Sequence, residues 1–518
     1  MSRLRLSAGF LARLVLFFSL LAVYLRTLAP GLTWANGGSD GGDLIAAAAT
    51  GGVAHPTGYP LYLLLAELFQ LLPVGPLAFR TNLMSALFAA LAAVLVYELV
   101  LHSQPTRALS PAWPAALAAG YIFGLAPLVW SQAVITEVYT LQAFLLALIL
   151  TLYTRAPAAS SPHSKRLDLL RGLALGAVMG NHVTTILLVP AALVLGSISR
   201  PAQPQGRDGF PASAFASPRF DWHAFLRQGA MFGVGLSIYV ILPLRALAQS
   251  PINWGNPVTP ARLWWLVSGQ LYQSYYLQFI PSQLQEHIQA AAALLLAQLG
   301  IAGLALSVIG LLVFGRVSPL YVLTAWIAVA HVVFAALYGS ADWYLYLIPV
   351  VLSFAIWAGL GIASLTDRFS QHVSRNGASR NRSYLRIALG VLVTLHFLLR
   401  AVDDVGQIDA SADLRAEAFG GEVLSGVPED AIVFAEGDPA VFTLWYFHFA
   451  LGERPDVAVL AEDLLHFDWY QETLRSTYPS LVIPGPFPWP ETIAATNPSR
   501  AVCEVRYANQ TELFCTDP

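Results

Sequence analysis

The sequence contains few charged residues and almost no cysteine. Only 11% of its 518 residues are Asp, Glu, Lys or Arg, and 56% are hydrophobic, whereas a soluble domain has roughly 25% charged residues. This shortage of charge excludes an ordinary soluble protein and predicts a polytopic membrane protein. The only cysteines, Cys503 and Cys515, lie near the C-terminus. They could form one disulfide if this end lies outside the cytoplasm.

Signatures of several other protein classes are also missing. The chain has no GxxxxGK[ST] phosphate loop, no HExxH motif and no paired CxxC, so nucleotide-driven transport and zinc proteolysis lose support. No basic face indicates a nucleic-acid partner. Internal repeats, which are usual in transporters, are not found either.

Long apolar runs dominate residues 1–404. A membrane-spanning helix needs roughly 20 mostly apolar residues, and the runs predict spans at 10–29, 79–102, 112–130, 135–153, 228–247, 289–314, 319–338, 345–365 and 384–402. The segment 169–199 is broken at Asn181 and His182 and has basic residues at both ends, so we expect a hairpin of two short helices. The sequence therefore predicts an all-α fold of about eleven transmembrane helices.

The distribution of positive charge predicts the orientation of these helices. Of the 28 Lys and Arg residues, eighteen fall on the predicted cytoplasmic segments, five lie near the outer face and five lie in the C-terminal region. Because basic loops favour the cytoplasm, we expect a cytoplasmic N-terminus, an outer loop at 30–78 and an extracytoplasmic C-terminus. The expected location is a bacterial plasma membrane.

From residue 405 the composition becomes that of a soluble protein. Short β-rich runs alternate with helical ones in DAIVFAEGDPAVFTLWYFHFALGERPDVAVLAED, which predicts a small α/β domain. The predicted organisation is a transmembrane domain over 1–404 and an extracytoplasmic domain over 405–518.

Two carboxylates stand out in the first outer loop, in SDGGDLIAAAATGG. Asp40 and Asp43 are three residues apart and would share one face of a short helix. Such a pair suits a general base and a partner that orients it or binds the acceptor. The alternative is structural: with Ser39 they cap the helix and complement its dipole. On spacing alone, the structural interpretation leads.

Three residues are candidates for binding a phosphate group. His55 lies in the turn HPTGYP, His182 lies at the break of the hairpin, and Arg245 ends a span at the outer side. Imidazole and guanidinium groups suit phosphate oxygens, and an intramembrane histidine is a functional candidate. The alternatives are a solvated loop residue for His55, a hydrogen bond between helices for His182 and snorkelling for Arg245.

Five further residues are candidates for binding an acceptor or a sugar. Glu137 begins a span next to Tyr139, Tyr59 lies beside the two prolines of the first-loop turn, and Trp254 and Asp342 lie in outward polar segments. The alternatives are a dipole complement for Glu137 and an aromatic belt at the membrane interface for Trp254.

The first hundred residues resemble the DUF2723 membrane family, which is grouped with GT-C glycosyltransferases akin to protein O-mannosyltransferases. In that family an acidic pair, roughly D-S-G-E, precedes the run V-A-H-P-P-G-Y-P-L-Y. Here the pair is D-G-G-D at 40–43 and the run is V-A-H-P-T-G-Y-P-L-Y at 53–62. Asp43 thus replaces the usual Glu, and Thr57 replaces the second Pro. The likeness continues through WSQAVITEVYTLQAF, GNHVTT, NWGNP, DWY at 342–344 and RPDV, and so covers nearly the whole chain.

The resemblance implies an inverting GT-C enzyme that moves a hexose, with mannose favoured, from a polyprenyl-phosphate donor. The acceptor would be a hydroxyl of a protein, such as that of a Ser or Thr, or of a glycan, on the outer membrane face. Asp40 would take the hydroxyl proton, and His55, His182 or Arg245 would meet the charge of the leaving phosphate.

No cofactor is expected, and no metal is favoured, although Asp40, Asp43 and Asp342 could gather around a divalent ion. Two other function classes remain open. A transporter or flippase of lipid-linked sugars would use the same polar groups for passage without transfer. A non-catalytic assembly subunit would be indifferent to Asp40.

Overall fold

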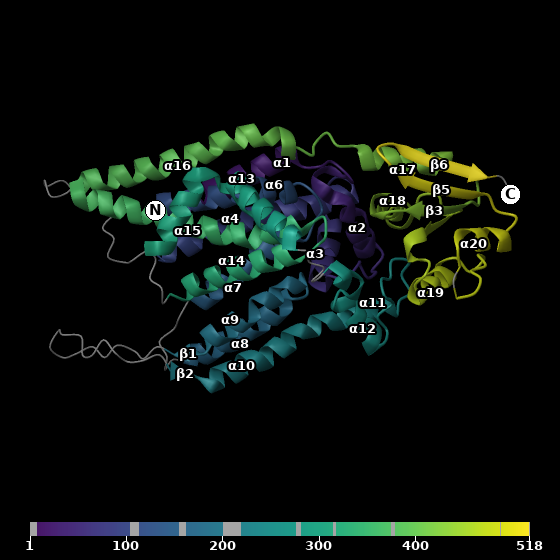
Figure 1. Cartoon of the computed structure of the whole chain (residues 1–518), viewed down its shortest axis with the longest axis horizontal. Coiled ribbons are helices and arrows are strands. Elements are labelled where there is room, and N and C mark those ends of the chain that lie inside the picture. The colour runs from purple at the N-terminus through teal and green to yellow at the C-terminus, as the bar shows by residue number, and fades with distance from the viewer. Residues whose placement is uncertain are drawn as a thin grey trace, which may run out of the picture.

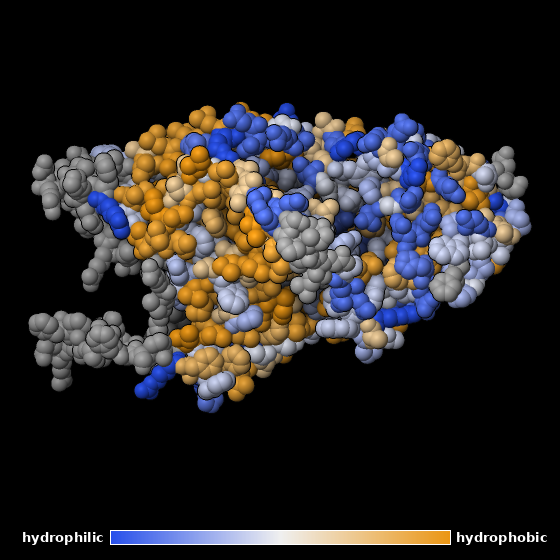
Figure 2. Space-filling model, in the orientation of Figure 1, coloured by the Kyte–Doolittle hydropathy of each residue, from blue (hydrophilic) through white to orange (hydrophobic). Residues whose placement is uncertain are grey.

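The computed structural model describes residues 8–103, 113–154, 162–199, 219–275, 281–313, 318–373, 379–486 and 488–516. A helical bundle forms one end of the molecule, and a sheet with its helices forms the other (Figure 1). Apolar side chains cover much of the visible face of the bundle, whereas the sheet end is more polar (Figure 2). This division is the one expected of a bundle that is surrounded by a bilayer.

Helices make up the bundle because a spanning helix satisfies its backbone hydrogen bonds internally. They are α1 (Ala8–Thr27), α4 (Leu77–Ser103), α5 (Trp113–Gly124), α6 (Pro127–Ala133), α7 (Tyr139–Thr154), α8 (Pro162–Val178), α9 (Val189–Gly196), α10 (Trp222–Gly235), α11 (Ile241–Ala246), α13 (Pro281–Val313), α14 (Pro319–Leu337), α15 (Ile348–Val373) and α16 (Ser379–Ile408). Helices α4, α5, α7 and α15 pack together, and α15 is buried over most of its apolar length.

Six helices in the described part of the chain are long and apolar enough to cross a membrane. The pair α5 and α6 makes a seventh if it is counted as one span, but it bends by 66°. The span expected at 112–130 is thus a bent pair of helices, because Ala126 is extended before Pro127, as residues before proline tend to be. The figure of about eleven spans stays a prediction.

The segment 169–199 folds as the predicted hairpin. Gln228 of α10 contacts both arms of the hairpin, since it lies against Gly172 of α8 and against Gly196 at the end of α9. The tip is bound to the first loop, where the backbone N–H of Leu61 donates to the carbonyl of Gly180 at 2.9 Å. The hairpin therefore carries His182 to the side of the bundle where the first loop lies.

The first loop contains η1 (Ala35–Asp40), α2 (Gly41–Ala49) and α3 (Pro60–Gln70). Helix α2 lies where the sequence predicts a helix, and Asp40 occupies its N-cap position. However, the Asp40 side chain makes no capping hydrogen bond. The capping interpretation is therefore wrong for the Asp40 carboxylate.

The C-terminal region holds a four-stranded sheet in the order β4-β3-β5-β6. Its elements are α17 (Arg415–Gly426), β3 (Ile432–Glu436), α18 (Asp438–Trp445), β4 (Ala458–Ala461), α19 (Asp468–Thr477), α20 (Pro490–Thr496), β5 (Val502–Tyr507) and β6 (Thr511–Thr516). Strand β3 pairs in parallel with β4 and β5, and β6 is antiparallel to β5. Strands β3 and β4 are almost wholly buried, which explains their continuous apolar sequence.

Short elements complete the described chain. They are η2 (Val183–Leu187), β1 (Ile198–Ser199), β2 (Arg219–Phe220), η3 (Leu236–Val240), α12 (Pro260–Val267), η4 (Gln270–Tyr275), η5 (Trp343–Leu347), the π-helix η7 (Tyr446–Ala450) and η8 (Glu462–Leu464).

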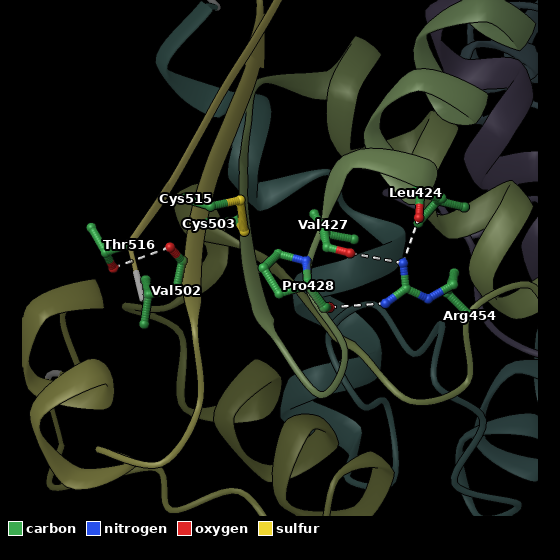
Figure 3. The surroundings of a disulfide bond; sticks show 8 residues. All are labelled: Leu424, Val427, Pro428, Arg454, Val502, Cys503, Cys515 and Thr516. Atoms are coloured by element: carbon green, nitrogen blue, oxygen red, sulfur yellow. Dashed lines mark hydrogen bonds between the residues drawn. A yellow bond between two sulfur atoms is a disulfide. The ribbon is translucent and has the colours of Figure 1, made fainter. Parts of the chain in front are cut away.

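Cys503 and Cys515 form a disulfide that joins β5 to β6 (Figure 3). The two residues are direct partners in the antiparallel register, and their Cα atoms are 4.1 Å apart. Near it, Arg454 donates to the carbonyls of Leu424, Val427 and Pro428 (Figure 3). The pairing that the sequence allows is therefore present.

The C-terminal region packs tightly on the first loop. Helix α18 contacts both η1 and α2, and Trp34 Nε1 donates to Thr443 Oγ1 at 3.1 Å. Asp413 Oδ2 accepts from Thr33 Oγ1 at 2.6 Å and from the backbone N–H of Trp34 at 3.1 Å. The two parts therefore lie on the same side of the bundle.

Candidate active site

A cavity of about 300 Å³ lies where the first loop, the hairpin tip and the C-terminal region meet. Seven of the ten residues that the sequence predicts for a site line it: Asp40, His55, Tyr59, Glu137, Tyr139, His182 and Asp342. The three that do not line it are Asp43, Arg245 and Trp254. The fold thus gathers residues that are up to three hundred positions apart in the sequence.

Asp40 opens into this cavity. Its side chain is 38% exposed, and its Oδ2 lies 3.6 Å from Nε2 of His55. The left-handed backbone of Asn36 and Gly37 turns the chain shortly before it. Burial raises the pKa of the Asp40 carboxyl above its usual value, and the neighbouring His55 opposes only part of this rise. The carboxylate can therefore meet a substrate while it stays next to a cation.

Asp43 lies behind the cavity and is fully buried. Its Oδ2 accepts the backbone N–H of His55 at 2.9 Å and lies 2.7 Å from His55 Nδ1. Its Oδ1 accepts the indole N–H of Trp254 at 2.9 Å. Both oxygens are therefore occupied, so Asp43 does not face a substrate as a partner that binds the acceptor would, and a role in orienting the base stays a prediction.

Trp254 is buried with 4% exposure, and its ring packs against those of Phe442, Trp445 and Trp469. The structure therefore does not place it for stacking on a sugar in the cavity. Its indole instead fixes Asp43.

His55 lies between the two carboxylates. Burial lowers the pKa of the His55 imidazole, but Asp40 and Asp43 outweigh this effect and raise the pKa to about 9. The ring is stacked on Phe442 at a centroid distance of 6.2 Å and meets Tyr59 edge-on at 5.1 Å. Since both of its nitrogens face carboxylates, His55 has no free N–H for a phosphate.

His182 has a different environment. Its Nδ1 accepts the backbone N–H of Thr184 at 3.3 Å and lies 2.8 Å from Thr184 Oγ1. A neutral ring that accepts at Nδ1 carries its proton at Nε2. The rings of Tyr59, Tyr139 and Tyr346 lie 5.7–6.0 Å from the imidazole centroid. The site therefore holds one imidazole with a defined tautomer and an N–H donor.

Arg245 is engaged away from the cavity. Its guanidinium forms an ion pair with Glu67 of α3 and donates to the carbonyl of Gly52 at 3.1 Å. No sequence pattern indicates this partner, because Glu67 and Arg245 are 178 positions apart. The structure therefore does not bring the predicted phosphate ligand to the site.

One carboxyl that the sequence did not single out also lines the cavity. Asp438 begins α18, directly after strand β3 and Gly437. Although Asp438 is exposed to the cavity, partial desolvation there raises the pKa of its carboxyl to about 6, and Asp40 adds to the effect. A usable signal was present, because ligands of α/β folds bind at the carboxyl ends of parallel strands and Asp438 follows such a strand.

The carboxylates do not form a metal cluster. Within the described ranges, no group of three or more His, Cys, Asp or Glu residues could hold a metal ion. Asp43 is turned to His55 and Trp254, so the set of Asp40, Asp43 and Asp342 that the sequence allowed is not assembled. A reaction without a metal remains a prediction.

Comparison with known proteins adds independent information. The family described as the Protein O-mannosyl-transferase TMEM260 N-terminal domain matches residues 40–204, and TMEM260-associated domain 2 matches residues 416–512. The chain is 26% identical to Protein O-mannosyl-transferase TMEM260 of Mus musculus over 489 residues, with 90% of this chain covered. It is 25% identical to Protein O-mannosyl-transferase tmem260 of Dictyostelium discoideum over 518 residues, with 91% covered. The chain spans only 65% and 59% of these two relatives.

Among solved structures, ArnT from Cupriavidus metallidurans bound to undecaprenyl phosphate superposes with a TM-score of 0.57 at 14% identity. The match covers 97% of this chain and 94% of ArnT. This likeness shows the fold, while the DUF2723 assignment stays a prediction. The chain is therefore a helical membrane protein with a GT-C fold, and it is similar to the TMEM260 protein O-mannosyl-transferases over most of its length.

Proposed function

We propose that the protein is an inverting GT-C glycosyltransferase that moves a hexose, with mannose favoured, from a polyprenyl-phosphate donor to a protein hydroxyl. The observation that carries this proposal is Asp40, whose carboxylate makes no capping bond and opens into the cavity. Relatives named protein O-mannosyl-transferase support the sugar and the acceptor. A fold neighbour bound to undecaprenyl phosphate supports the type of carrier.

The reaction is a single displacement. Asp40 accepts the proton of the acceptor hydroxyl, whose oxygen attacks the anomeric carbon of the hexose. A new carbon–oxygen bond forms while the bond from the anomeric carbon to the phosphate oxygen breaks. The polyprenyl phosphate leaves with the electron pair. Attack from the face opposite the leaving group inverts the anomeric configuration.

His182 is the group best placed to meet the leaving phosphate. Of the three residues predicted to bind a phosphate, His55 is held between carboxylates and Arg245 is paired with Glu67. His182 lines the cavity and carries an Nε2 proton when neutral. A positioned N–H donor stabilises charge that develops in the transition state.

The proposed location is the outer membrane face, with the N-terminus in the cytoplasm. The first loop and the C-terminal region border one cavity, so they share one side of the membrane, as the predicted topology requires. A disulfide in the C-terminal region supports an oxidising compartment on that side.

The test uses the purified full chain, radiolabelled polyprenyl-phosphate mannose and a Ser/Thr-rich peptide. The proposal predicts label on the peptide in a linkage of inverted configuration, and a parallel reaction with the glucose donor tests the sugar. A flippase would move the labelled lipid across liposomes without labelling the peptide. Translocation without transfer from either donor would overturn the proposal.

A further inference from the structure

The proposed reaction uses Asp40 but leaves three buried neighbours without a role. We propose, on the basis of the proposed function, that His55 and Asp43 are positioning residues for the base. Asp43, tethered by Trp254, fixes the His55 imidazolium, and the imidazolium keeps Asp40 ionised at the cavity.

The first step concerns how Asp43 is held. A carboxylate without exposure is costly unless donors satisfy its oxygens. Asp43 receives three donors: the backbone N–H and Nδ1–H of His55 on Oδ2 and the indole N–H of Trp254 on Oδ1. Charge-assisted hydrogen bonds of this kind are roughly twice as strong as neutral ones. The network is therefore rigid and fully paired at Asp43.

The second step concerns the charge of His55. Nδ1 lies 2.7 Å from Asp43 Oδ2, and Nε2 lies 3.6 Å from Asp40 Oδ2. A neutral ring would turn a lone pair toward one of these carboxylates, whereas an imidazolium offers a proton to each. One oxygen of Asp43 holds both the backbone and the ring of His55, so the ring cannot easily swing away.

The third step concerns why Asp40 needs a cation. Glu137, Asp342 and Asp438 line the same cavity, and Asp43 lies behind it. Like charges favour protonation of a carboxyl, and a protonated Asp40 cannot accept a proton. No Lys or Arg is among the described residues that line the cavity. His182 also lines it but accepts hydrogen bonds at Nδ1. His55 is therefore the cation that opposes these carboxylates.

The experiment measures kcat/KM against pH for the full chain with polyprenyl-phosphate mannose and peptide. In His55→Gln the acid limb of the profile should move up by about 1–3 pH units, since an opposite charge within 4–6 Å lowers a carboxyl pKa by about that much. Asp43→Asn should move it in the same direction but by less, because this substitution also removes a like charge that raises the pKa of Asp40. Activity should recover in part at high pH, because the base is still present.

Trp254→Phe is the milder variant and covers the case in which Asp43→Asn fails to fold. It keeps an aromatic ring but removes the donor to Asp43 Oδ1, so its acid limb should move up slightly. The matched control is Trp264→Phe, at a tryptophan that is 69% exposed, and its profile should equal that of the wild type.

Asp40→Asn separates this inference from the proposed function. If Asp40→Asn is inactive at every pH and the acid limb moves up in His55→Gln, both the proposed base and the positioning role are supported. If Asp40→Asn is inactive but His55→Gln keeps the wild-type limb, or loses activity equally at all pH values, the positioning role is wrong. If Asp40→Asn is fully active, the proposed base is wrong.

Discussion

The carbonyl oxygen of Phe442 occupies the space that a side chain at Gly42 would need. A Cβ atom at Gly42 would lie 2.2 Å from this oxygen, which is far inside van der Waals contact. Helix α18 of the C-terminal region is therefore seated directly on α2 of the first loop. This contact brings Asp438 to the cavity that Asp40 also lines. Two segments about four hundred residues apart in the sequence therefore line the same cavity.

Gly42→Ala should weaken the packing of α18 on α2. The added methyl group meets backbone and not a flexible side chain, and overpacking of this kind typically costs about 1–3 kcal/mol. We expect a lower thermal midpoint in detergent and lower transfer activity. Gly421→Ala is the control, because no atom lies within 4 Å of its Cβ and alanine favours helix by about 1 kcal/mol. Equal thermal midpoints for Gly42→Ala and the wild type would show that α18 and α2 are not closely packed at Gly42.

Asp438→Asn should stabilise the protein at neutral pH. Partial desolvation of this exposed carboxyl in the cavity, together with the charge of Asp40, raises the pKa of Asp438 from 3.8 to about 6. A raised pKa means that the folded state binds the proton more tightly than the unfolded state does. The stability that protonated Asp438 contributes is therefore fully present below pH 3.8 and is lost as pH rises through 6. The variant should therefore melt at a higher temperature than the wild type at pH 7.5, with little difference at pH 4. A lower midpoint at pH 7.5 would contradict this assignment.

The stability that His55 contributes should decline in alkali. The two carboxylates raise the pKa of His55 from 6.5 to about 9, so its contribution is fully present below pH 6.5 and is lost as pH rises through 9. The gap in thermal midpoint between the wild type and His55→Gln should be widest near pH 6 and small near pH 10. A gap that does not depend on pH would mean that packing, not charge, explains the effect of this substitution.

Removal of the disulfide should loosen the edge of the sheet. Cys503 and Cys515 are 12 positions apart, and closing a loop of this size stabilises a fold by about 3 kcal/mol in the chain-entropy model. The double serine variant should therefore have a lower thermal midpoint than the wild type. Maleimide labelling of the native, unreduced wild type should find no free thiol, and two labelled thiols would contradict the bond.

The sequence allowed most of the cavity to be predicted because the signals there are local. Asp40 and His55 lie in one loop, and His182 lies at a visible break in an apolar run, so the predicted topology places them on one side of the membrane. Partner choice was not predictable in the same way. The pairing of Arg245 with Glu67 and of Trp254 with Asp43 depends on tertiary packing.

The same limit explains Asp438. Periodicity predicted strands and helices after residue 405, but no local pattern states that α18 docks on α2. Likewise, a hydropathy window cannot show that the run at 112–130 bends by 66° between α5 and α6. Apolar composition is compatible with a straight helix and with a bent pair.

The most direct test of the account is the transfer rate of Asp40→Asn. The substitution keeps the size of the side chain and removes the base, so the rate from polyprenyl-phosphate mannose to peptide should fall about 10²–10⁴-fold. The thermal midpoint should stay near that of the wild type. Asp403→Asn, at an exposed residue of α16, is the control and should be fully active. A rate for Asp40→Asn within a few-fold of the wild type would contradict the account.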